Sequence, residues 1–485
     1  MHLSRRALFG SAAAILFAAC GAPPPTQAPK PVEPAKAAEA AKPAAPADAA
    51  KPIAKAAPTP APTPTLPPVF TPVPQAPGTT KLLMRVHWAG SSFNEFQKII
   101  NDYNATQGTK DKIYINLERF VAGQAGPIAT FIADFQAGTQ EDIYHLGQNN
   151  LADLAARNFF SAPTMEVQNY IKQNFLDPAV RTGTWEGKIM GYPTENQPHM
   201  LFGNTKMFQA AGLDANKDMP KKWDDIRRVA KATTKVEGGT KTQAGFIVHY
   251  QNGERITVQR LMFQFVNGAP LVDLSKTPPV WDVKSDGARA WTELMANMYA
   301  DNSLSADLGP DTITWPQRKG NLISHDAFAV WFRLVTAGQP GILEEQFTAP
   351  LYSADGTKTG NMARNYHFLV SSKSKEKDLS WLHLKWMNEG PEFRMQNFQT
   401  HVFGFVASVK NYELPKFFPA QMKTAFQESI SGPNQTIMPV AKGMNEVFNI
   451  FRDNHDALVF GKVTAAEYTA KVDEELKRAM SQAYG

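Results

Sequence analysis

The chain has 485 residues and 43% apolar residues, which suffice for two or three domains with sizeable cores. Its formal net charge is +5, but two leader arginines and a lysine surplus of two in residues 22–78 account for four of those charges. The rest of the chain is nearly neutral, which argues against nucleic-acid binding. One cysteine excludes an intramolecular disulfide and a cysteine-based zinc site, and the ten histidines lack metal-site spacing, so we expect no metal and no cofactor.

Residues 1–20 have the pattern of an export signal, with Arg5 and Arg6 before an apolar stretch that ends at Ala19. That stretch is too short to span a bilayer, which needs about 20 residues. Small residues directly before Cys20 resemble the lipobox of bacterial lipoproteins, and this resemblance implies an acylated cysteine at the new N-terminus. An ordinary secretory signal is the alternative, and the twin-arginine and general export routes both stay open.

Residues 21–79 are predicted to form a disordered tether. Half of the protein's 36 prolines fall between residues 22 and 78, among alanines, lysines and threonines. Such a segment lacks the apolar bulk that offsets the entropy of ordering, and it favours polyproline II structure. Fully extended, it would reach up to about 170 Å at roughly 3.1 Å per residue.

The folded part opens with alternating strands and helices. We expect strands over residues 81–88 and 113–120, helices over 93–103 and 127–137, and a strand that starts at residue 142. This order predicts an α/β architecture with a largely parallel sheet. Ligands of such sheets bind at the carboxyl ends of strands, where residues 88–92 and 145–150 form loops.

A second set of elements follows residue 195. We expect strands over residues 200–204 and 246–250, and helices over 205–211, from Pro220 onward, and over 285–302. The last helix carries apolar residues at helical spacing, which indicates a core-facing stripe.

The segment LFGNTKMFQAAGLD…MPKKWDDIRRVAKATTK, residues 201–235, resembles the signature of family 1 extracellular solute-binding proteins, the maltose-binding-protein family. Four further segments are similar to that family in the same order. They are residues 137–163, WEGKIMGYP at 185–193, residues 319–331 and residues 366–388. The resemblance covers nearly all of residues 80–410.

The resemblance implies a two-lobed periplasmic-binding-protein fold of type II, with mixed sheets flanked by helices and a hinge that the chain crosses more than once. Lobe 1 would comprise residues 80–194 and 364–410, and lobe 2 residues 196–363 and 411–485. It also implies a monomeric substrate-binding lipoprotein of an ABC importer, anchored on the outer face of the cell membrane. Such a protein captures a carbohydrate between its lobes and delivers it to the permease.

A sugar site needs amides or carboxylates for hydroxyls and an aromatic ring for the apolar face of the sugar. The candidate ligand-binding residues are Trp88, Ser91, Ser92, Gln148, Asn149 and Asn150 in lobe 1, Tyr192, Glu195 and Gln197 at the first crossing, Asn361 and Arg364 at the later crossing, and Phe328 or Trp331 as the stacking ring of lobe 2. Trp88 and Trp331 could instead belong to the core. Arg364 indicates either an acidic sugar or a structural salt bridge.

Three other functions agree less well with the sequence than carbohydrate transport does. A secreted glycosidase would need two paired carboxylates, and no pattern pairs Glu195 with Asp142. The chain has no GxSxG, GxxxxGK[ST] or GxGxxG motif, so we expect no enzyme. A polyamine, an iron complex or a peptide is the alternative solute for the same fold, although the candidate loops are rich in amides. An adhesin or scaffold is the third possibility.

Overall fold

The computed structural model describes residues 71–88, 90–120, 126–309, 317–326, 345–390, 392–403, 405–414, 416 and 434–485. The leader with Cys20, most of the tether, and both Phe328 and Trp331 lie outside these residues. Within the described ranges, no helix combines the length and apolar character that crossing a membrane would need. Residues 66–485 form one compact unit.

The first sheet has five strands in the order β2-β1-β3-β16-β6. They are β1 (Thr80–Val86), β2 (Ile113–Arg119), β3 (Ile143–Gly147), β6 (Gly191–Pro193) and β16 (Tyr366–Val370). Strand β1 pairs in parallel with β2 and β3, whereas β16 runs antiparallel to both β3 and β6. The expected strands at the start of the folded part are confirmed to within a few residues.

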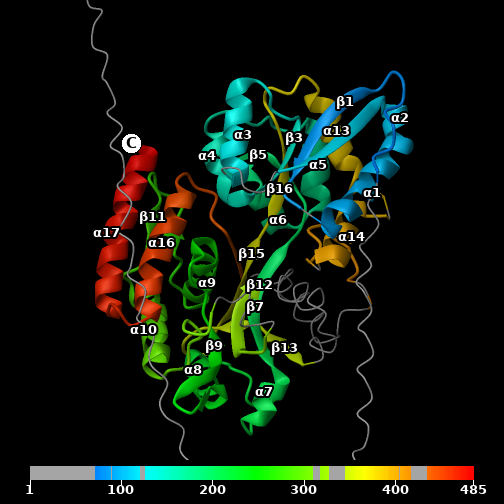
Figure 1. Ribbon diagram of the computed structural model, residues 1–485. Helices are drawn as coiled ribbons and strands as arrows, with labels where there is room; N and C mark the ends of the chain where they lie inside the picture. Colours follow the sequence, from blue (N-terminus) through cyan, green and yellow to red (C-terminus); the bar gives the residue numbers. More distant parts are fainter. Residues whose placement is uncertain are drawn as a thin grey trace, which may run out of the picture. The chain divides into compact units, whose positions relative to one another are not determined.

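Both faces of this sheet pack against a hydrophobic core, because successive side chains of a strand point to opposite faces. On β16, Phe368 joins the core that contains Phe96 and Trp381, whereas the next residue, Leu369, joins the core around Phe131 on the other face. The helices around the sheet are α1 (Ser91–Ala105), α2 (Gln107–Asp111), α3 (Gly126–Ala137), α4 (Leu151–Ala155), α5 (Met165–Asn174), α6 (Asp177–Thr182), α13 (Lys377–Trp386) and α14 (Arg394–Phe398). Figure 1 shows α3 and α4 away from α1 and α13, in agreement with the two cores.

The second sheet has the order β14-β15-β7-β12-β9-β8, with β13 added to β7 and β17 to β15. Its strands are β7 (Gln197–Asn204), β8 (Lys235–Glu237), β9 (Thr240–Ile247), β12 (Gly320–Asp326), β13 (Gln346–Ala349), β14 (Leu351–Tyr352), β15 (Thr359–Arg364) and β17 (Gln435–Ile437). Of its described pairs, β12–β9 and β15–β17 are parallel and the rest are antiparallel. This mixed pairing agrees with the mixed sheets that the family resemblance implies, and β7, which is buried along its whole length, takes antiparallel partners from distant segments.

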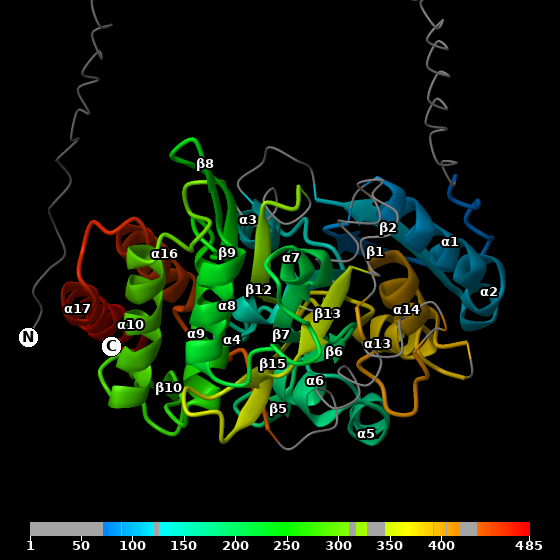
Figure 2. The same ribbon diagram turned by 90° about the horizontal axis from the view of Figure 1, so that it is seen from below.

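Helices α7 (Thr205–Ala210), α8 (Trp223–Thr233), α9 (Gly253–Val266), α10 (Asp286–Ala300), α16 (Met444–Val459) and α17 (Ala465–Tyr484) accompany the second sheet. Figures 1 and 2 show α10, α16 and α17 side by side, and residues of all three share one core with α8 and α9. Two expected boundaries are wrong: α8 begins at Trp223 rather than at Pro220, and β9 ends at Ile247 instead of continuing to Tyr250.

The chain crosses between the sheets through very short segments. Only residues 194–196 separate β6 from β7, and Asn365 alone separates β15 from β16. Thr194, Glu195, Asn196 and Asn365 are all buried. The short buried crossings tie the ends of the two sheets closely together.

Candidate functional site

A cavity of about 220 Å³ lies where β1 and β3 of the first sheet end. It is lined by His87, Ile128, His145, Leu146, Gly147, Asn149, Asn150, Glu254 and Tyr366. His87 directly follows β1, and the two asparagines belong to the short helix η1 (Gln148–Asn150) after β3. This is the edge at which α/β sheets bind ligands.

Two glycines shape the cavity. A Cβ atom on Gly147 would lie 2.6 Å from the Asn149 Oδ1 and 3.4 Å from the Tyr366 ring, so a larger residue there would disturb the lining. Gly253 begins α9 so close to α16 that a Cβ atom would lie 1.9 Å from the Phe448 carbonyl oxygen. This approach sets the first turn of α9, where Glu254 reaches the cavity from the side of the second sheet.

Aromatic rings form one wall of the cavity. The rings of His87 and His145 stack with centroids 4.9 Å apart, and the Tyr366 ring lies 5.5 Å from that of His145. The Arg364 guanidinium lies over the Tyr366 ring, and its Nη2 donates to the Tyr366 hydroxyl at 2.7 Å. The same Nη2 is 3.0 Å from Glu254 Oε1, so this cation is already paired with a carboxylate of the lining.

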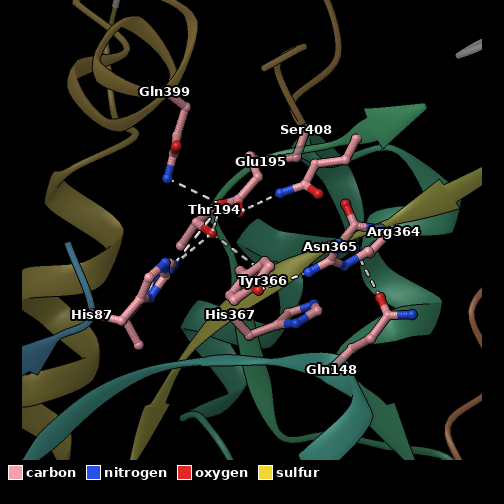
Figure 3. Close-up of polar contacts among 12 residues, drawn as sticks. His87, Gln148, Thr194, Glu195, Arg364, Asn365, Tyr366, His367, Gln399 and Ser408 are labelled. Carbon is pink, nitrogen blue, oxygen red and sulfur yellow. Dashed lines mark hydrogen bonds and ion pairs between the residues drawn. The ribbon is translucent and has the colours of Figure 1, made fainter. Parts of the chain in front are cut away.

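Glu195 lies beneath this wall, buried at the first crossing. Its Oε2 accepts hydrogen bonds from the Thr194 hydroxyl and, at 3.0 Å, from Gln399 Nε2, as Figure 3 shows in part. Its Oε1 accepts from Gln197 Nε2 at 3.2 Å. Burial raises the pKa of Glu195 to about 7, against the opposing effects of Thr194 and Arg364. The carboxyl group is therefore partly protonated near neutral pH.

The imidazoles connect Glu195 to the cavity. His145 Nε2 is 3.0 Å from Thr194 Oγ1, and His145 Nδ1 is 3.0 Å from His87 Nδ1. Burial lowers the pKa of His145 well below its usual range. His87 keeps accessible surface on the cavity, yet the surrounding protein desolvates its ring and lowers its pKa to about 4. Both rings are neutral at pH 7.

The crossing itself is held by a second polar residue. Gln396 Nε2 donates to the Thr194 carbonyl oxygen at 3.1 Å, and its Oε1 accepts from the Ser408 backbone N–H at 2.7 Å. Figure 3 shows Ser408 on the far side of Glu195 from His87. Thr194 therefore has both its backbone and its side chain fixed.

The predicted site residues fall into four groups. Asn149 and Asn150 line the cavity, and Glu195, Gln197 and Arg364 form the polar layer beside it. Trp88, Tyr192, Ser91, Ser92, Gln148 and Asn361 are not in the lining. Phe328 and Trp331 lie outside the described residues.

The predicted residues that do not line the cavity lie in the hydrophobic core, at the start of a helix or in a strand pair. Trp88 and Tyr192 are buried in the hydrophobic core of the first sheet, where the Trp88 ring lies 4.7 Å from that of Phe96. Ser91 is exposed at the start of α1 and Ser92 is buried. Asn361 pairs with Gln435 across β15 and β17.

Sequence reasoning missed His87, His145, Glu254 and Tyr366 as lining residues. His87 had a usable signal, because it directly follows β1, and His145 lies within β3, whose start was also predicted. Glu254 had none, since it reaches the cavity from the first turn of a helix far along the chain. Among the side chains that the structure describes, no group of three histidines, cysteines or acidic residues is arranged for a metal ion.

Comparison with known proteins places this geometry in a family. The model of the family described as bacterial extracellular solute-binding protein matches residues 98–426. No curated protein sequence matches the chain. Among solved structures, the sugar-binding protein MalE from Xanthomonas citri is 16% identical, with a TM-score of 0.67 over 83% of this chain and 98% of its own.

Two further structures are similar. The cyclic alpha-maltosyl-1,6-maltose binding protein from Arthrobacter globiformis has a TM-score of 0.68 at 12% identity, over 84% of this chain and 100% of its own. The GacH receptor of Streptomyces glaucescens, solved unliganded and with acarbose, has a TM-score of 0.68 at 14% identity, over 83% and 99%. These likenesses show the two-lobed fold. Because the family model spans more than half of the sequence, the chain belongs to the bacterial extracellular solute-binding proteins.

Proposed function

We propose that the protein is the substrate-binding lipoprotein of an ABC importer, and that it captures a carbohydrate between two lobes and delivers it to the permease. Lobe 1 would comprise residues 80–194 and 364–410, and lobe 2 residues 196–363 and 411–485. The observation that carries this proposal is that the cavity draws its lining from both sides, with Asn149 and Asn150 after β3 and Glu254 from α9.

The lining suits a sugar. Two asparagine amides and the Glu254 carboxylate match ligand hydroxyls, and the Tyr366 ring offers an apolar face. The cavity of about 220 Å³ is smaller than the roughly 300–1,000 Å³ typical of drug-sized ligands. A short sugar therefore fits this conformation best, and a longer one requires the lobes to separate.

Other solutes fit less well. A polyamine needs several unpaired carboxylates, whereas the carboxylate of the described lining, Glu254, is paired with Arg364. An iron complex needs free histidine or tyrosine ligands. Both nitrogens of His145 are engaged, and the Tyr366 hydroxyl accepts from Arg364.

Export and anchoring complete the proposal. The family is extracellular, and the leader before Cys20 is proposed to direct export. Acylation of Cys20 would then hold the protein at the outer face of the membrane, with residues 21–79 as the tether.

A thermal-shift screen tests the function. The Cys20→Ala chain is heated with sugars, sugar acids, polyols, polyamines and ferric complexes. A ligand at 100 times its dissociation constant adds about 2.7 kcal/mol to stability. We expect stabilisation by at least one sugar, its loss in Asn149→Ala, and its retention in Gln209→Ala, which removes an exposed amide on α7. Stabilisation by a polyamine or ferric complex and by no sugar would contradict the proposal.

A further inference from the structure

Glu254 places a carboxylate at the wall of the cavity. The other described side chains of the lining are two imidazoles, two amides, a phenol and apolar groups. The Glu254 side chain keeps 27% of its surface exposed, and its ion pair with Arg364 is 3.0 Å long. A carboxylate can accept about four hydrogen bonds. No second side chain in the described part of the chain bonds to Glu254, so it can still accept from a solute.

Arg364 lies behind the wall. It is not in the lining, its side chain is only 11% exposed, and its guanidinium covers the Tyr366 ring at 5.2 Å while it donates to the Tyr366 hydroxyl (Figure 3). Its charge is nevertheless felt in the cavity. Burial is the main reason that the pKa of His87 is about 4, and the Arg364 charge lowers it as well.

One other acidic group responds to the Arg364 charge. This group is Glu195, which lies beneath the wall and outside the lining, and whose pKa burial raises to about 7. Below that pH, Glu195 is mostly the neutral acid. The charge that a solute meets is then determined by the Glu254 carboxylate in front and the Arg364 guanidinium behind.

This arrangement treats neutral and acidic solutes differently. A sugar hydroxyl can donate to the Glu254 carboxylate, and a hydrogen bond to an ionised acceptor is stronger than one between neutral groups. A solute carboxylate meets the like charge of Glu254 first, in a cavity where charges interact more strongly than in water. The cation that could attract it is already neutralised by Glu254.

We propose that Glu254 is a specificity-determining residue, which binds hydroxyls of a neutral sugar and, by neutralising Arg364, keeps acidic sugars out of the cavity. The choice of a sugar as the solute rests on the proposed function. The selection against acidic sugars rests on the placement of the two charges, with the carboxylate in the lining and the guanidinium behind it.

Titration with matched sugars tests this selection. The Cys20→Ala chain is titrated at pH 6 with glucose and glucuronate, galactose and galacturonate, and mannose and mannuronate. The members of each pair differ only at C6, so the ratio of their affinities isolates the effect of the charge. We expect the neutral member of the pair that binds to be at least about ten-fold tighter. Glu254→Gln keeps the size of the side chain but removes the counter-charge of Arg364, and should lower this ratio about ten-fold or more.

Glu237→Gln is the matched control. It removes the same charge from the exposed strand β8, outside the lining, and should leave the ratio unchanged. Damage to the fold would weaken both members of a pair alike and would not move the ratio. A wild type that prefers a uronate, or an unchanged ratio in Glu254→Gln, would overturn this inference and leave the carbohydrate proposal standing. Binding of none of the six sugars would overturn both.

Discussion

Two hydrogen bonds join Gln148 and Asn365. The Gln148 Oε1 accepts from the Asn365 backbone N–H at 2.9 Å, and the Gln148 backbone N–H donates to the Asn365 carbonyl oxygen at 3.4 Å. The Gln148 Nε2 also donates to the Met438 carbonyl oxygen at 3.1 Å. One buried amide thus joins the end of β3, the second crossing between the sheets and the segment after β17.

Gln148→Ala should therefore act on stability. It leaves two buried backbone groups without partners, so we expect the free energy of unfolding to fall by about 1–3 kcal/mol. Asn149→Ala is the matched variant, because its side chain lines the cavity one residue away, and it should lower ligand affinity with little change in stability. Urea denaturation and ligand titration of both variants measure the two effects. A stable Gln148→Ala protein with weakened binding would reverse this assignment.

Glu195 should make stability depend on pH. Its folded-state pKa of about 7 is above the ordinary 4.5, so the folded state holds a proton that the unfolded state releases. The resulting stabilisation is complete below about pH 4.5 and disappears as pH rises through 7. It amounts to about 3 kcal/mol at most. Glu195→Gln retains the polar shape without titrating.

The measurement is the difference in unfolding free energy between wild type and Glu195→Gln, taken from pH 5 to pH 8. We expect this difference to move against the wild type as pH rises. Burial lowers the pKa of His367 to about 4 and of His383 to about 3, so these groups change stability in the opposite direction in acid. They are present in both proteins and cancel in the difference. A constant difference would show that Glu195 has no raised pKa.

Strands β1, β2 and β3 of the first sheet were predictable, because each has a local pattern of apolar residues. Apolar runs in β1 and β3 are separated by helices with apolar periodicity, and parallel pairing follows from that order. The strand pairing of the second sheet could not be predicted in the same way. Every residue of β7 is buried, and its neighbours β12, β13 and β15 come from far along the chain. A uniformly buried strand carries no signal for the direction of its partners.

Some features of the candidate site could also be predicted from the sequence, and others could not. Asn149 and Asn150 were predicted as site residues from their place after a strand, and they line the cavity. The sequence does not reveal that Gln148, their neighbour, turns its amide to the backbone of Asn365 and Met438. The direction of a side chain in a short helix depends on contacts that form only in the folded protein.

Cys20 is predicted to anchor the protein, since small residues precede it and a long tether follows. Cys20→Ala removes the acceptor for the acyl groups, so the protein should move from the membrane fraction to the soluble fraction. Fractionation with mass spectrometry of the wild-type N-terminus checks this. A wild-type chain without acyl mass, or a variant that still sediments with membranes, would refute the anchor.

Phe328 and Trp331 are the two candidates for the ring of lobe 2 that stacks on the sugar. Alanine at the stacking position should cost at least about 2 kcal/mol of ligand affinity. Alanine at a core position should instead cost about 3–5 kcal/mol of stability. Affinity and stability measured on Phe328→Ala and Trp331→Ala distinguish the two roles. If both variants are destabilised with normal affinity, neither ring stacks on the ligand.

Ligand binding is predicted to bring the two lobes together. Two of the crossings are as short as residues 194–196 and Asn365, which permits rotation of the lobes about a few residues. A ligand that touches lining residues of both lobes binds the closed form more tightly and so shifts the population toward it. Solution scattering of residues 66–485, the compact unit, should show a smaller radius of gyration with the sugar identified in the screen.

A disulfide across the lobes provides the control. Asn445 Nδ2 donates to Asn150 Oδ1 at 3.2 Å, which joins η1 after β3 to the first turn of α16. The unit has no cysteine of its own, so Asn150→Cys with Asn445→Cys creates a single possible pair. Oxidation should lock the lobes, slow ligand entry and abolish the ligand-dependent change in scattering, and reduction should restore both. An unchanged radius of gyration in the reduced protein at saturating sugar would mean that binding does not close the lobes, because lobes that close on a ligand must become more compact.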